Sequence, residues 1–236
     1  MATTVTLATA DGDMGLYDVE PDGAPRGAVI VVQEAFGVND HIQDVTRRFA
    51  AEGYRAVAPH LFHRTGDPVI GYTDYDKIMP HFQALSEGGL LGDLDATIAH
   101  LGSAGFEPGR VGIVGFCMGG TVTFLASVRR RLGAGVTFYG GGVGEGRFGL
   151  PSLVELAPGL QTPWLGLYGD KDQGIPVADV ERLRVAAAEA PVDTEVVRYA
   201  DADHGFHCDA RASYHKESAA DAWQRTLAWF GAHLPS

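Results

Sequence analysis

The chain of 236 residues has few cysteines, a deficit of basic residues and no long apolar run. Its 2 cysteines exclude a scaffold held together by disulfides. Lys and Arg number 18 against 30 Asp and Glu, so the net charge is −12. A surface of that sign repels phosphates, which argues against nucleic-acid and anionic-membrane partners. The charge is instead typical of a soluble protein.

Targeting segments are also lacking. The longest early apolar run, 28–32, is far shorter than the roughly 20 residues that span a membrane. Residues 1–15 contain Asp11 and Asp13 but no Lys or Arg, so no secretory signal is expected. No repeat or linker divides the chain. We expect one cytoplasmic domain over residues 1–236, as a monomer or small homo-oligomer.

What is present is an alternation of strand and helix patterns. A hairpin is predicted where 4–7 and 15–19 flank Asp11-Gly12. The predicted strands are 27–33, 54–58, 110–115, 135–139, 164–168 and 194–199, and the predicted helices are 40–52, 91–101, 121–130, 177–190 and 214–233. This order indicates an α/β fold, a mostly parallel central sheet with helices on both faces. Functional groups are then expected just after the strands.

The first such group is Cys117, in Gly115-Phe116-Cys117-Met118-Gly119-Gly120 between a strand and a helix. This is the pattern of a nucleophile elbow, with Cys in place of the usual Ser. A helix N-terminus favours the thiolate, and the backbone N–H of Met118 can serve as an oxyanion donor. The alternative is a structural Cys in a Gly-rich turn.

An acid and a histidine follow two later predicted strands. Asp170 and Asp172 come after the strand 164–168, and His204 comes after 194–199. The order nucleophile, acid, histidine is that of α/β-hydrolases. His204 would take the thiol proton and Asp172 would orient the imidazole, while Asp170 competes for the acid role.

Glu34 directly follows the apolar strand 27–33. A carboxylate at the end of a buried strand is costly unless it is paired or functional. A surface position or a charge near a helix N-terminus is the alternative interpretation.

These residues resemble the dienelactone hydrolase family, which has the α/β-hydrolase fold. The resemblance covers about residues 4–234. The stretches that carry it are Gln33-Glu34-Ala35-Phe36-Gly37-Val38-Asn39, the Cys117 elbow, Gly169-Asp170-Lys171-Asp172 with Pro176, and His204-Gly205-Phe206.

The resemblance implies a Cys117, Asp172 and His204 triad that hydrolyses an ester or lactone through a thioester acyl-enzyme. It implies Glu34 as a fourth partner, which holds the resting thiol neutral and swings away when substrate binds. The backbone N–H groups of Ala35 and Met118 are implied as the oxyanion hole. No cofactor and no metal is expected.

The residues expected to contact substrate are less well marked. The candidates are Phe36, His60, Lys77, Tyr139, Phe206 and Arg211. Two arginines bind the substrate carboxylate in the family. The first position, four residues after His204, is Cys208 here, and the segment 66–90 contains only Lys77 as a basic residue. Arg211 could partly substitute. The departure argues against an acidic dienelactone as substrate.

Two other signals are weaker. Residues 144–149 match G-x-G-x-x-G, but Leu150-Pro151-Ser152 separates them from any helix, so a loop that borders the pocket is the preferred interpretation. His60 and His63 form H-x-x-H, and 204–208 holds two His and a Cys, yet zinc needs three or four converging ligands.

Rival functions follow from the same residues. One is a general carboxylesterase or thioesterase for a neutral substrate. Another is a hydrolase-fold module that binds a ligand without turnover. A third is a redox protein that uses Cys117 and Cys208, although no C-x-x-C pattern is present.

Overall fold

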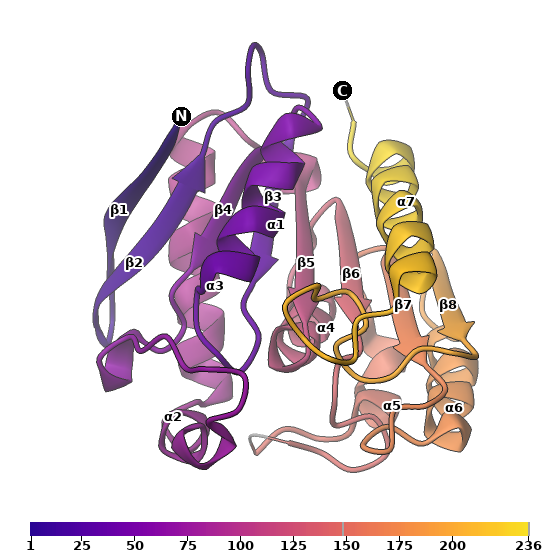
Figure 1. Cartoon of the computed structure of the whole chain (residues 1–236). Helices are drawn as coiled ribbons and strands as arrows, with labels where there is room; N and C mark the ends of the chain where they lie inside the picture. The colour runs from indigo at the N-terminus through magenta and orange to yellow at the C-terminus, as the bar shows by residue number, and fades with distance from the viewer. Residues whose placement is uncertain (148, 236) are drawn as a thin grey trace.

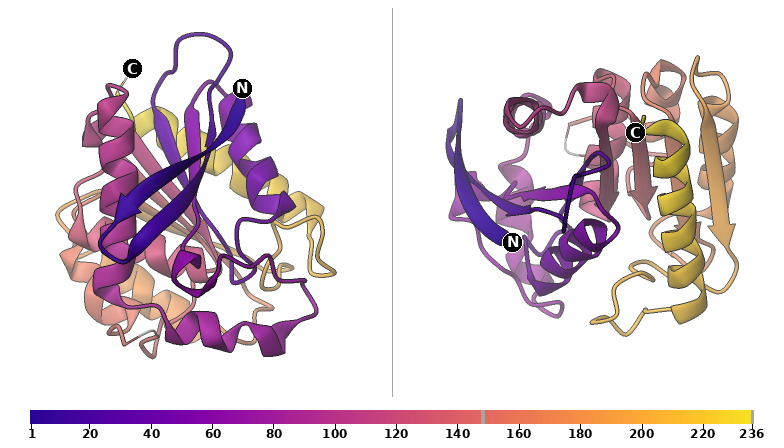
Figure 2. Two further views of the ribbon diagram at one scale, coloured as in Figure 1. Left: turned by 90° about the vertical axis from the view of Figure 1, so that its left-hand side faces the viewer. Right: turned by 90° about the horizontal axis from the view of Figure 1, so that it is seen from above.

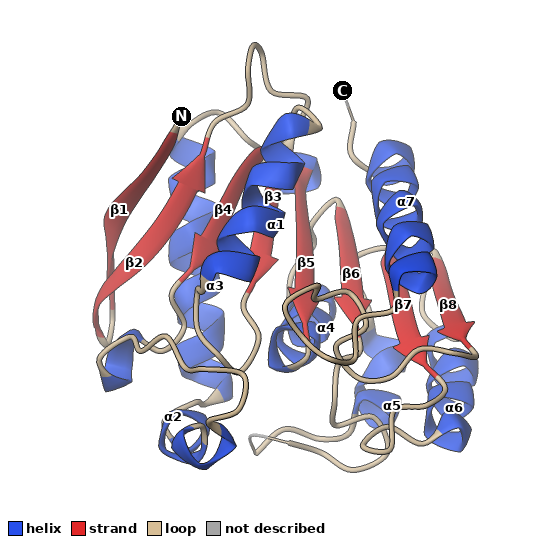
Figure 3. Cartoon of the chain, in the orientation of Figure 1, coloured by secondary structure: helices blue, strands red, loops and turns tan. Residues whose placement is uncertain are grey.

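The computed structural model describes residues 1–147 and 149–235, which build an eight-stranded sheet with helices on both faces (Figures 1 and 3). The strands are β1 (Ala2–Thr9), β2 (Gly12–Val19), β3 (Ala28–Val32), β4 (Arg55–Pro59), β5 (Val111–Phe116), β6 (Ala134–Phe138), β7 (Trp164–Gly169) and β8 (Thr194–Tyr199). The helices are α1 (Asp40–Ala51), α2 (Met79–Gln83), α3 (Glu87–Ser103), α4 (Met118–Arg129), α5 (Leu153–Leu156), α6 (Val177–Ala187) and α7 (Lys216–His233).

The strand order is β1-β2-β4-β3-β5-β6-β7-β8, and only β1 and β2 run antiparallel to their neighbours. The predicted mostly parallel sheet is therefore confirmed. In the parallel part, Val32 of β3 pairs with Gly115 of β5, and Phe116 pairs with Phe138 of β6. This register brings the residues after β3, β5 and β6 to the same edge of the sheet, the lower edge in Figure 1.

Helices cover both faces of the sheet (Figure 2). Helices α1 and α7 lie on one face, where the rings of Phe49 and Phe230 join them at 5.8 Å between centroids. The other face carries α3, α4, α5 and α6. Helix α1 begins after Asn39, whose side chain accepts a hydrogen bond from the Ile42 N–H. Burial of its apolar stripe on the sheet fixes this helix in place.

The predicted elements are present with shifted ends. The last helix begins at Lys216 and not at 214, because the His215 side chain caps it through the Ser218 N–H. The helix expected from 121 begins at Met118, directly after Cys117. The short helices α2 and α5 were not predicted, since four or five residues carry no readable periodicity. None of the helices among the described residues has the length and apolar character needed to cross a membrane.

Candidate active site

Cys117 stands alone between the last residue of β5 and the first of α4. Its backbone adopts φ 55° and ψ −116°, and its N–H donates to the Phe138 carbonyl at 3.1 Å. A non-glycine residue in such a conformation costs about 1–3 kcal/mol, and the surrounding structure must impose it. The conformation is that of a nucleophile elbow, as the sequence predicts.

Glycines on both sides of Cys117 permit this turn. A Cβ on Gly115 would overlap the Gly119 carbonyl, and a Cβ on Gly119 would overlap the carbonyl groups of Val32 and Gln33. The helix can therefore approach the sheet only with glycine at both positions. Met118 opens α4, so its N–H has no partner within the helix and is left for a ligand.

His204 and Asp172 lie beside Cys117. The His204 Nδ1 is 2.6 Å from Asp172 Oδ2, and Asp172 Oδ1 accepts the Gly174 N–H at 2.9 Å. On its own, burial would lower the pKa of His204. The Cys117 sulfur and Asp172 outweigh burial and raise this pKa to about 10. The imidazole therefore favours its charged form.

The structure separates the two carboxylates that competed for the acid role. Asp170 makes a bidentate pair with Arg198, at 2.7 and 2.8 Å. Asp172 is the one that contacts His204. The chain turns at residues 170 and 171, so the two carboxylates meet different partners, and the sequence alone does not reveal which of them faces His204.

Glu34 is fully buried after β3. Its Oε1 is 3.3 Å from a guanidinium nitrogen of Arg211, and Oε2 has no hydrogen-bond partner among the described residues. Burial raises the pKa of Glu34 although Arg211 opposes the shift. The guanidinium of Arg211 also lies over the rings of Phe36 and Tyr72, at 5.6 and 5.9 Å.

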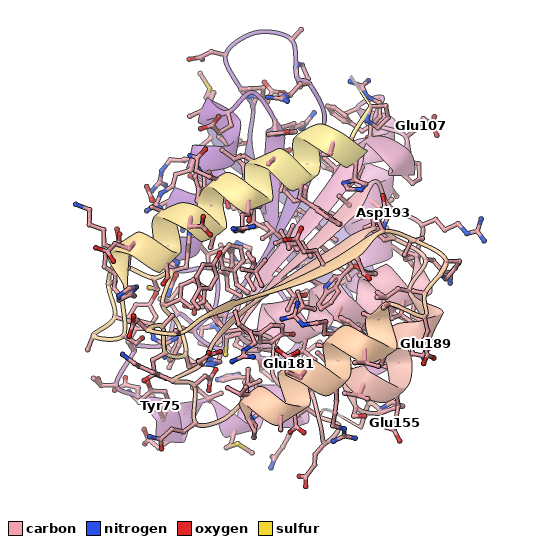
Figure 4. All side chains as sticks on the ribbon, turned by 90° about the vertical axis from the view of Figure 1, so that its right-hand side faces the viewer. Tyr75, Glu107, Glu155, Glu181, Glu189 and Asp193 are labelled. Carbon is pink, nitrogen blue, oxygen red and sulfur yellow. The ribbon has the colours of Figure 1, made fainter. Side chains whose placement is uncertain are left out.

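A cavity of about 510 Å³ opens above these groups. Its apolar wall includes Phe36, Ile78 and Phe82, and Figure 4 shows Tyr75 of the same wall at the lower end of the molecule. The lining comprises Ala35, Phe36, Tyr75, Ile78, Phe82, Cys117, Met118, Gly141, Arg147, Asp172, Gln173, Gly174, Ile175, Asp203, His204 and Arg211.

The other candidate substrate contacts lie elsewhere. Tyr139 and Phe206 are fully buried and outside the cavity lining. The Tyr139 ring packs on that of His204 at 5.1 Å and on that of Phe206 at 5.3 Å between centroids. His60 pairs with Asp67, and the exposed Lys77 pairs with Asp74 at 2.7 Å. Neither His60 nor Lys77 belongs to the cavity lining among the described residues.

Arg147 is a charged lining residue that sequence reasoning missed. It reaches the cavity from the glycine-rich segment, which does border the pocket as expected. A Cβ on Gly141 would lie 2.5 Å from an Arg147 nitrogen, so the guanidinium lies close to the backbone of Gly141. A lone Arg among glycines was the available signal. Phe148 of this segment lies outside the described residues.

The histidine pairs considered as metal ligands do not converge. His60 contacts Asp67, and His63 contacts Asp93 at 3.1 Å. His204 is held by Asp172. His207 packs instead on the ring of Phe116, at 5.3 Å between centroids.

A mostly parallel eight-stranded sheet with a strained residue at a sharp strand-to-helix turn defines the α/β-hydrolase class. Thermogutta terrifontis esterase 2 shares this fold, with a TM-score of 0.73 at 18% identity over 100% of this chain and 96% of that one. The chain belongs to the dienelactone hydrolase family, whose sequence model matches residues 14–234. It is therefore a hydrolase of the type that acts on ester or lactone bonds.

Individual relatives agree with this membership. The chain is 40% identical over 233 residues to a Yersinia pestis protein named "Putative carboxymethylenebutenolidase", covering 97% of this chain and 87% of that one. An Escherichia coli K12 protein of the same name is 41% identical over 232 residues, covering 95% and 85%. The crystal structure titled "Putative Dienelactone Hydrolase" from Klebsiella pneumoniae has a TM-score of 0.89 at 42% identity, covering 98% of both chains.

Proposed function

We propose that Cys117 attacks the carbonyl carbon of a small ester or lactone and forms a thioester acyl-enzyme. The observation that carries this proposal is the orientation of His204. Its Nδ1 is taken by Asp172, which leaves Nε2 for the Cys117 thiol, and these two partners together raise the pKa of the imidazole. A histidine held in this way can take the thiol proton and later return it.

The reaction then proceeds in two balanced steps. As the sulfur–carbon bond forms, the carbonyl electrons move to oxygen, and the backbone N–H groups of Ala35 and Met118 stabilise the oxyanion. Collapse breaks the carbon–oxygen bond, and His204 protonates the departing alkoxide or enolate. Water, deprotonated by His204, next attacks the thioester and releases Cys117. Thiolate is itself a good leaving group, so activated esters and lactones fit better than amides.

Glu34 is the resting partner of the thiol in this proposal. Burial favours a neutral carboxyl there, and its unpartnered Oε2 is available to a neighbouring group. A thiol kept neutral until substrate arrives is protected from oxidation. Arg211 competes for the same carboxylate, so a substrate that recruits Arg211 changes what Glu34 contacts.

The cavity supports a substrate with an apolar body. Arg147 and Arg211 add positive charge at its wall, so a carboxylate on the substrate has partners although the family's two arginine positions differ here. A neutral ester is the second candidate, because Glu34 already occupies Arg211.

The test is the hydrolysis of p-nitrophenyl acetate under pre-steady-state conditions. We expect a burst of one p-nitrophenolate per chain in the wild type, and no burst in Cys117→Ala. Cys208→Ala is the matched control, since it removes the other thiol and should keep the burst. Equal inertness of wild type and Cys117→Ala toward a panel of esters and lactones would favour a ligand-binding module instead.

A further inference from the structure

A second group of potential ligands lies buried beside Glu34. Glu34 follows β3, His41 is in the first turn of α1, and Cys208 is in the loop between β8 and α7. All three are buried, and one ligand atom from each lies within 4.8 Å of the others. This group is distinct from the H-x-x-H pair and from the Cys117 triad.

These residues have unsatisfied polar atoms. Among the described residues, neither ring nitrogen of His41 has a hydrogen-bond partner, nor does Glu34 Oε2. The side chains of His41 and Glu34 are only 2% and 0% exposed. A buried polar atom without a partner costs about 1–3 kcal/mol, so a ligand that met Glu34 Oε2 and one ring nitrogen of His41 would remove this cost. The nearest charged group to His41 Nδ1 is the exposed Asp209, whose Oδ1 is 3.8 Å away.

The remaining neighbours define the chemistry of that ligand. The Cys208 thiol donates to Tyr72 Oη at 3.2 Å, and Asn39 Nδ2 donates to the same oxygen at 3.0 Å. One carboxylate, one imidazole and one thiolate balance a charge of +2 and suit a thiophilic ion of the zinc type. Two nearby charges oppose a cation, Arg211 on Glu34 Oε1 and Arg48 near His41.

The geometry requires a modest contraction. Bonds of about 2.0–2.3 Å from zinc to oxygen, nitrogen and sulfur give ligand separations near 3.5 Å in a tetrahedron. The ligand atoms now lie within 4.8 Å of one another, so their separations have to decrease by up to about 1 Å, which side-chain rotation can supply. Tyr72 Oη or a water would complete four ligands.

We propose that Glu34, His41 and Cys208 form a site for a thiophilic divalent cation of the Zn²⁺ or Cd²⁺ type. Binding replaces the proton of the Cys208 thiol, so affinity rises with pH. Bound metal also fixes the Glu34 carboxylate, which is then no longer available to the Cys117 thiol. Occupation therefore inhibits the hydrolase, a consequence that rests on the proposed role of Glu34 in catalysis.

The binding experiment uses the full chain with Cys117→Ala, because Cys117 and His204 could themselves hold a metal. We expect one Cd²⁺ per chelator-treated chain, with the ultraviolet charge-transfer band of a cadmium–thiolate bond, and displacement by Zn²⁺. Adding Cys208→Ser or His41→Gln should weaken binding at least about 100-fold, since even outer partners of a metal change affinity 10–100-fold.

His207→Gln is the matched control. His207 is also a buried histidine, 6.0 Å from the His41 ring, but it is not among the three ligands. This variant should bind Cd²⁺ as before. Absence of the band in Cys117→Ala, or binding that His41→Gln leaves unchanged, overturns the proposal. Thermal unfolding checks each variant, and His41→Gln decides the matter if Cys208→Ser does not fold.

The inhibition experiment uses the wild-type nucleophile. Zn²⁺ should slow p-nitrophenyl acetate hydrolysis, and His41→Gln should raise the half-inhibiting concentration at least about tenfold while His207→Gln does not. Equal inhibition of both variants places the effect at Cys117 and overturns the inhibitory role. A wild type without any esterase activity refutes the proposed function, whereas the binding result stands independently.

Discussion

The two sides of Cys117 differ in how their polar groups are paired. On the paired side, toward β7 and β8, His204 binds Asp172, and Asp172 binds the backbone of Gly174. On the unpaired side, toward β3 and α1, Glu34 Oε2 and both ring nitrogens of His41 have no hydrogen-bond partner among the described residues. Pairing fixes the geometry needed for chemistry, whereas unpaired groups reduce stability and keep the capacity to bind something else.

The paired side predicts the largest effect. Asp172→Asn should lower kcat by about 10⁴-fold, because the amide favours the wrong imidazole tautomer. Asp170→Asn, two residues away and bound to Arg198, is the matched control and should change kcat little. Steady-state kinetics on an activated ester provide the comparison. A large loss in Asp170→Asn with little in Asp172→Asn would reverse the assignment of the acid.

The unpaired side predicts an effect on stability. Burial raises the pKa of Glu34 above its ordinary value of 4.5, so the folded state holds a proton that the unfolded state has released. This contribution to stability is lost as the pH rises above 4.5 toward the folded pKa. The free energy of unfolding of Glu34→Gln should therefore rise relative to that of the wild type by up to about 1.4 kcal/mol per pH unit in that window.

Denaturant unfolding between pH 5 and 8 measures this gain. Glu107→Gln is the control, since Glu107 is an exposed carboxylate at the opposite end of the molecule from the cavity (Figure 4). Its curve should run parallel to that of the wild type. A Glu34→Gln curve that is also parallel would contradict the raised pKa.

The two arginines of the cavity give the smallest predicted effect. Arg211 is tied to the unpaired side through Glu34, whereas Arg147 is exposed. Arg147→Ala should raise KM about tenfold for an ester with a carboxylate and leave kcat unchanged, since one exposed charge-assisted bond is lost. The KM of Arg147→Ala for a neutral ester should equal that of the wild type. The control variant Arg182→Ala on α6 should leave both KM values unchanged. An equal rise in KM for the neutral ester would mean that Arg147 shapes the cavity and does not bind the substrate carboxylate.

The fold and the paired side could largely be predicted from the sequence. Apolar runs such as 27–33 and 110–115 mark buried parallel strands, and the residue after each strand reaches the same edge of the sheet. Cys117 and His204 were identified in this way. The choice between Asp170 and Asp172 needed coordinates, because both follow the same strand.

The unpaired side and the cavity wall could not be predicted to the same degree. His41 has the appearance of an ordinary polar residue in a helix, and only the packing of α1 on the sheet buries it beside Glu34 and Cys208. Arg147 comes from a segment without periodicity, and its position beside the backbone of Gly141 could not be read from that segment. Lys77 and His60 were expected at the substrate but do not line the cavity among the described residues, since they pair with nearby carboxylates.

The covalent intermediate tests the central claim most directly. Rapid quenching of the wild type with p-nitrophenyl acetate, followed by peptide mass spectrometry, locates the acetyl group. We predict one acetyl group on the peptide that contains Cys117, and none on that peptide in His204→Ala within the same time. An acetyl group on another residue, or turnover without any acylated Cys117, would contradict the account.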